Sequence, residues 1–124
     1  MHTLSRLLAP TIIYVVTVGF GFWVSHLGKP YNGLLFNVHK LAALAGVVIA
    51  VIQVVKTLRG ADVTALVVAL LALAALCVLA LFASGALMSV GEVAQAPLLL
   101  VHRIAPVVLA IVAVWAAVLL AKLL

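Results

Sequence analysis

The sequence predicts an all-α integral membrane protein: a single domain over residues 1–124, built as an up-down bundle of four spanning helices. Of its 124 residues, 69% are hydrophobic and only 7% are charged. This composition is typical of membrane proteins and unlike that of soluble domains. Four apolar runs each reach about 18 residues or more, enough to cross a hydrocarbon core of about 30 Å. Because helices satisfy their own backbone polar groups in lipid, each run is expected to be a spanning helix.

The first helix is predicted over residues 10–27, after a short amphipathic stretch at residues 1–9. We expect Pro10 in its first turn, where the missing N–H costs little. The adjacent aromatic residues Phe22 and Trp23 suit a membrane interface. A loop dense in turn-forming residues follows, and it ends this first span.

The second and third helices are predicted over residues 34–58 and 63–90. Gly60 is a candidate C-terminal cap of the first of these, and Asp62 is a candidate N-cap of the next. Because so few residues connect them, the two helices are expected to be antiparallel neighbours. The single cysteine, Cys77, supports no disulfide or metal framework and is interpreted as a small packing residue.

The fourth helix is predicted over residues 97–124, opening at Pro97. Pro106 removes the hydrogen bond that the carbonyl of His102 would otherwise accept, so a slight kink is expected beside that histidine.

The charges indicate how the chain lies in the membrane. Four spans place both termini on one side, with Arg6, Lys56, Arg59 and Lys122; the opposite side has Lys29, Lys40, Arg103 and Glu92. The positive-inside rule therefore favours cytoplasmic termini in a multi-pass protein of the inner (cytoplasmic) membrane. Since the basic residues are scattered at helix ends, the net charge of +5 points to lipid head groups and not to nucleic acid.

Two short segments of the chain nearly repeat each other, Val38-His39-Lys40-Leu41-Ala42 and Val101-His102-Arg103-Ile104-Ala105. Each histidine lies about five residues into a predicted helix, or some 7–8 Å below its start at about 1.5 Å per residue. A histidine inside an apolar span is costly and usually has a function and a partner. The matched pair predicts one haem with two axial histidine ligands, so His39 and His102 are the predicted iron ligands.

The neighbouring residues are consistent with a flat, bulky cofactor. Gly21 in the first helix and Gly85 in the third would let the edge of a macrocycle approach the backbone. Lys40 and Arg103 are positioned to pair with two haem propionates. Small side chains that would leave room beside the ligands follow each histidine: Ala42, Ala43, Gly46 and Ala105.

These residues resemble the small four-helix bacterial membrane cytochromes of b type, the cytochrome b-561 group that includes superoxide oxidase, and also the haem-bearing core of ferric reductases. The resemblance covers the whole chain in architecture but rests on His39-Lys40, His102-Arg103 and the nearby glycines. It implies haem b and transfer of single electrons to or from a quinol, superoxide or a redox-protein partner. Those families usually hold two haems, whereas this chain has ligands for one, near the outer face; crossing the other half would need a partner or a bound quinone.

Other hypotheses remain open at this stage. A cofactor-free subunit of a larger complex, or an oligomer, would use the small-residue faces Ala42/Gly46/Ala50 and Ala80/Ser84/Met88 as helix-packing seams. A zinc site is less favoured because no further carboxylate or thiolate lies at that depth. His26 is interpreted as an interface residue. A transporter is disfavoured because no acidic residue lies inside a span.

Overall fold

The computed structural model describes residues 2–28, 31–90 and 95–123, and these residues form four α-helices and no strand. The helices are α1 (His2–Leu27), α2 (Gly33–Leu58), α3 (Ala65–Val90) and α4 (Gln95–Leu123). This confirms the predicted all-α fold class and its four helices. Lys29 and Glu92, which entered the charge argument, lie outside the described residues.

All four helices are long and apolar enough to cross a membrane. The candidate spans contain 23 to 27 residues, and large apolar side chains are exposed along every helix. Exposed apolar surface on this scale is unfavourable in water and favourable in hydrocarbon. The chain is therefore a multi-pass membrane protein whose solvent is the lipid bilayer.

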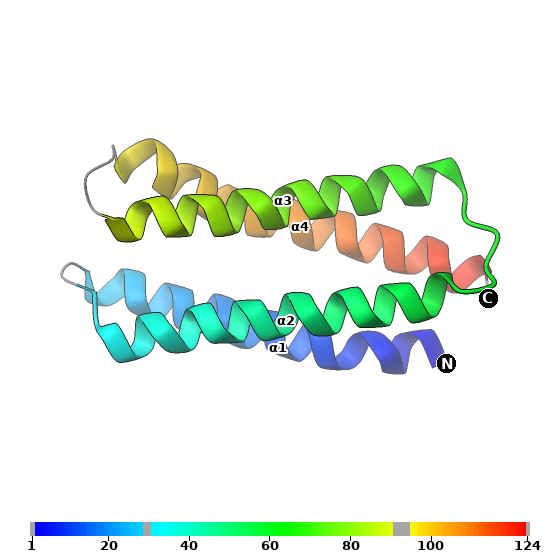
Figure 1. The fold of residues 1–124 in the computed structure, drawn as a ribbon, viewed down its shortest axis with the longest axis horizontal. Helices are drawn as coiled ribbons and strands as arrows, with labels where there is room; N and C mark the ends of the chain where they lie inside the picture. The colour runs from blue at the N-terminus through cyan, green and yellow to red at the C-terminus, as the bar shows by residue number, and fades with distance from the viewer. Residues whose placement is uncertain (1, 29–30, 91–94, 124) are drawn as a thin grey trace. The chain divides into compact units, whose positions relative to one another are not determined.

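The helices form two hairpins, each described here by itself. The N-terminal hairpin (Met1–Gly60) packs α1 against α2, and the C-terminal hairpin (Ala61–Leu124) packs α3 against α4. Figure 1 shows both antiparallel pairs, the first in blue to green and the second in green to red.

The N-terminal hairpin turns between α1 and α2 with clear local signals. Gly28 follows the last residue of α1 and has a φ of 72°, a left-handed conformation that glycine adopts without strain. Asn32 caps α2: its side chain accepts hydrogen bonds from the N–H groups of Leu34 and Leu35 at 3.0 and 3.2 Å. Farther along the pair, Gly46 faces Ile13, so this small-residue position serves packing within the hairpin.

The C-terminal hairpin has a small buried core. Leu70 from α3 packs with Val112 and Ala116 from α4. Around them lie partly buried apolar side chains: Leu71, Ala74, Val108 and Leu119. Since lipid is as apolar as these side chains, close packing stabilises the pair more than removal from water does.

Two expectations about helix starts are wrong. α1 begins at His2, so Pro10 lies inside the helix and not in its first turn. A proline there removes only the bond to the Arg6 carbonyl, and the helix continues through it. α3 begins at Ala65, and its cap is Thr64 in place of Asp62. The Thr64 hydroxyl oxygen accepts from the Val67 N–H at 3.4 Å, because it lies three residues before that donor.

The turn between α2 and α3 agrees better with the sequence. α2 ends at Leu58, Arg59 is its C-cap, and Gly60 follows with a φ of 76°. The left-handed conformation that ends the helix is thus placed at glycine, as expected.

Candidate functional site

His39 lies on α2, half-buried against α1. Its Nδ1 is 2.8 Å from the backbone oxygen of Thr17. Because a carbonyl oxygen only accepts, Nδ1 carries the hydrogen and donates it. In the neutral ring the lone pair is therefore on Nε2.

Gly21 allows this contact between His39 and the backbone of α1. A Cβ atom at position 21 would lie 2.9 Å from Cε1 of His39, closer than real Cβ atoms approach, and 3.3 Å from Nδ1, a tight contact. The Thr17 carbonyl points along α1 toward residue 21, since helical bonds run from residue i+4 to residue i. A side chain at position 21 would therefore require the imidazole to shift from its present place beside that oxygen.

His102 lies on α4, half-buried against α3. Its Nδ1 is 2.9 Å from the hydroxyl oxygen of Ser84, a residue only 3% exposed. The Ser84 hydroxyl donates its one hydrogen to the carbonyl of Leu81 at 3.2 Å. With the hydrogen directed to Leu81, the serine oxygen would accept from Nδ1–H, which is the tautomer of His39 and the one proposed for His102 below.

The two hairpins thus repeat one local arrangement. In each, an imidazole near the start of the second helix lies against a glycine of the first helix. A Cβ atom at Gly85 would lie 3.2 Å from Cε1 of His102, slightly less close than in the other pair. The acceptors differ, being a main-chain carbonyl for His39 and the Ser84 side chain for His102.

The two cations next to the histidines are exposed. The Nζ of Lys40 lies 4.2 Å from the ring centroid of Phe36, a cation–π distance. Phe36 in turn stacks on Tyr31, with centroids 5.9 Å apart and rings 2° from parallel. Arg103 is exposed on α4. Pairing of Lys40 and Arg103 with propionates stays a prediction.

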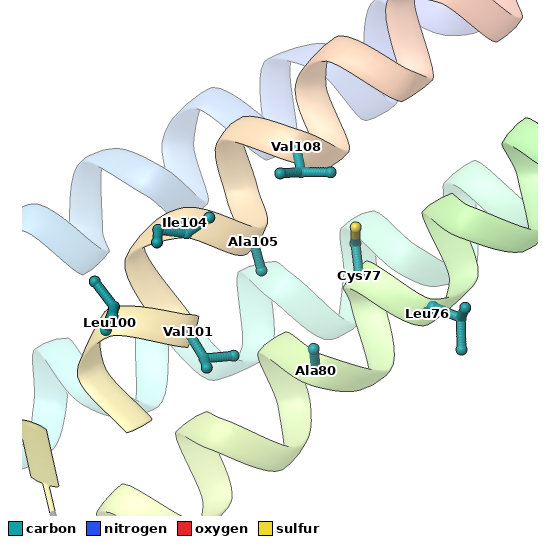
Figure 2. Close-up of a pocket in the computed structure, with 8 residues that line it drawn as sticks. All are labelled: Leu76, Cys77, Ala80, Leu100, Val101, Ile104, Ala105 and Val108. Carbon is teal, nitrogen blue, oxygen red and sulfur yellow. The ribbon is translucent and has the colours of Figure 1, made fainter. Parts of the chain in front are cut away.

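The small residues near the histidines have different surroundings. Ala42 and Ala43 are half-buried in α2, and Gly46 lies against Ile13. Ala105 is buried, and it lines an open apolar groove of about 320 Å³ on the C-terminal hairpin. Figure 2 shows the groove between side chains of α3 and α4: Leu76, Cys77, Ala80, Leu100, Val101, Ile104, Ala105 and Val108.

The structure adds residues that sequence reasoning missed. Thr17 had no assigned role, and Ser84 was considered only as a small packing residue. For Ser84, the available signal was its position directly before Gly85. Nothing in the sequence marks Thr17, because its contribution is a main-chain oxygen. Gly19, in contrast, is exposed, and a Cβ there would meet no described atom within 4 Å.

Other metal-binding chemistry is not assembled in the described part of the chain. Within residues 2–28, 31–90 and 95–123, no three histidine, cysteine or acidic side chains gather as a metal site. His26 is exposed at the end of α1. Ligation of a haem iron by His39 and His102 stays a prediction.

Comparison of the chain with protein-family models, curated proteins and solved structures finds no match.

Proposed function

We propose that this chain is an integral membrane cytochrome of b type that binds one haem b, with Nε2 of His39 and Nε2 of His102 as the iron ligands. The observation that carries the proposal is the matched state of the two imidazoles. Nδ1 of His39 lies 2.8 Å and Nδ1 of His102 lies 2.9 Å from an oxygen of the neighbouring helix, and donation of Nδ1–H to that oxygen directs the lone pair to Nε2. Histidines that bind metals almost always donate their other ring N–H in this way, which fixes the ring and raises its basicity.

The donor set fits haem b better than other groups. Two neutral imidazoles match the axial ligands of a low-spin haem, and the half-buried rings lie in apolar helices, where a macrocycle is soluble. Lys40 and Arg103 lie one residue after the ligands and are exposed, as partners of carboxylates at a membrane surface must be. No cysteine pair is present for covalent attachment of haem c.

Such a haem would supply reversible one-electron chemistry. His39 and His102 would both ligate the iron, and a haem held by two histidines would supply outer-sphere electron transfer. His39 and His102 hold and orient the group, Gly21 and Gly85 let the imidazoles lie against the helices, and Lys40 and Arg103 balance its carboxylates and attract an anionic donor.

The proposal includes a cellular location and a class of redox partner. The charge distribution supports a location in the cytoplasmic membrane with both termini in the cytoplasm, and the haem would then lie near the outer face. There it would exchange electrons with a quinol, superoxide or a redox protein, as the resemblance to the cytochrome b-561 group and superoxide oxidase implies.

A structural role is the competing explanation for the histidines. Each makes a hydrogen bond between helices of one hairpin, which by itself stabilises the hairpin in lipid. In that case the chain would be a cofactor-free subunit that packs into a larger complex.

Haem titration of the purified protein distinguishes the b-type cytochrome from the cofactor-free subunit. We expect the wild type and His26→Ala to give a low-spin spectrum at one haem per chain, and His39→Ala and His102→Ala to lose it. His26 is a matched control because it is exposed at the end of α1. If both single variants kept the low-spin spectrum, the assignment of the ligands would be wrong.

A further inference from the structure

We propose that Ser84 is a positioning residue for His102. The orientation and tautomer of His102 then depend on a side chain that a substitution can change, whereas those of His39 depend on the main-chain oxygen of Thr17. The choice of the Nδ1–H tautomer follows from hydrogen bonds alone. The effect on haem rests on the function proposed above.

The first step is the direction of the hydrogen bonds. Ser84 is almost fully buried, and its hydroxyl lies between two groups, the Leu81 carbonyl at 3.2 Å and Nδ1 of His102 at 2.9 Å. A hydroxyl has one hydrogen, and a carbonyl only accepts. In the proposed arrangement the hydrogen goes to Leu81 and the serine oxygen accepts from Nδ1–H of His102; a hydrogen directed to Nδ1 would require the other tautomer, and the test below distinguishes the two.

The second step is the cost of the alternative tautomer. If His102 carried its hydrogen on Nε2, Nδ1 would be an acceptor facing an oxygen whose hydrogen is already used. Ser84 would then have to give up its bond to Leu81. The Leu81 carbonyl would keep its helical hydrogen bond, so the Nδ1–H form makes one more hydrogen bond than the alternative and is favoured.

The third step is the difference between the hairpins. His39 donates to the main-chain oxygen of Thr17, which no substitution removes. His102 donates to a side chain, which a single substitution removes. The two imidazoles therefore provide an internal comparison, because Ser84→Ala should change one and leave the other unchanged.

The test uses the full chain, purified without haem and labelled with ¹⁵N in its histidine rings. Two-bond ¹⁵N–¹H spectra show which ring nitrogen carries the hydrogen. We expect Nδ1–H for both His39 and His102 in the wild type. In Ser84→Ala, His102 should move to a mixture of tautomers while His39 stays unchanged, which also shows that the variant is folded.

Ser89→Ala is the matched control. Ser89 lies on the same helix, and its hydroxyl donates locally, to the carbonyl of Ala86 at 2.7 Å. This variant should match the wild type. If His102 kept Nδ1–H in Ser84→Ala, or had Nε2–H in the wild type, the assignment of Ser84 would be overturned.

The consequence for haem is measured on the same variants. We expect Ser84→Ala to weaken haem binding by about 10- to 100-fold, the usual effect of removing such a partner. The reduction potential should rise, because a ligand that donates a hydrogen bond at Nδ1 is more basic and favours ferric iron. A structural role alone would not move the potential.

The outcomes are distinguishable. A wild type that binds no haem would refute the proposed function, and the tautomer spectra would still decide the role of Ser84 at His102. A variant with a changed tautomer but unchanged haem affinity and potential would refute the influence of Ser84 on ligation.

Discussion

Gly21 and His39 are in direct contact across the N-terminal hairpin, so that a Cβ atom at the glycine would lie 2.9 Å from Cε1 of the imidazole. In this position the ring lies beside the Thr17 carbonyl, whose oxygen is 2.8 Å from Nδ1. Gly85 and His102 repeat the relationship at 3.2 Å in the other hairpin. The glycines are thus part of how each histidine is oriented.

Replacing Gly21 should therefore disturb His39 selectively. In Gly21→Ala the new methyl group would push the ring away from Thr17, and we expect haem affinity to fall by about 10- to 100-fold, as for the loss of other hydrogen-bond partners of ligands. Gly19→Ala is the control, because a Cβ there meets no described atom within 4 Å. Haem titration compares them, and equal affinity in the two variants would argue against the role of Gly21.

The corresponding change in the other hairpin should be milder. At 3.2 Å, a Cβ at position 85 requires a shift of only a few tenths of an ångström at His102, which a side chain can accommodate. We expect Gly85→Ala to keep the low-spin spectrum with a smaller loss of haem affinity than Gly21→Ala. The reverse order would show that the ring of His102 is the more tightly confined.

Gly46 serves packing and gives a prediction about stability. A Cβ at position 46 would lie 3.1 Å from Cγ2 of Ile13, so Gly46→Val overpacks the contact between α1 and α2. Overpacking costs about 1–3 kcal/mol, measured as the free energy of unfolding in detergent. Ala45→Val adds the same β-branched side chain at an exposed neighbouring position and should cost only its helix propensity, below about 1 kcal/mol.

Lys40 tests whether exposed cations hold the haem carboxylates. If Lys40 pairs with a propionate, Lys40→Gln should lower haem affinity by no more than about fivefold, since exposed ion pairs contribute about 0.2–1 kcal/mol. Lys56→Gln, at the opposite end of α2, should leave affinity unchanged. An unchanged affinity in Lys40→Gln would assign this cation to its contact with Phe36 alone.

The fold was largely predictable because hydrophobic length dominates a membrane protein. Four apolar runs, each long enough to cross the hydrocarbon core as a helix, predict four spanning helices. The second helix begins and ends within a residue of its predicted bounds. The start of the first helix was not predictable from Pro10, since one lost hydrogen bond does not stop a helix in apolar surroundings. The cap at Thr64 was missed because Asp62 is the stronger capping residue in isolation.

The candidate site was predictable only in part. The repeated histidine segments and the glycines are visible in the sequence, and the structure brings each glycine to its histidine. The acceptors are not visible in the same way. Thr17 contributes a main-chain oxygen, which every residue has, and Ser84 contributes a hydroxyl whose orientation depends on the pairing of α3 with α4.

The central claim is that the chain holds one haem b through two histidines, and the reduced-minus-oxidised visible spectrum of the detergent-purified protein tests it most directly. With quantitation as the pyridine haemochrome, we predict a sharp low-spin signature at about one haem b per chain. A colourless protein that also fails to take up added haem would contradict the claim and leave His39 and His102 as interhelical hydrogen-bonding residues.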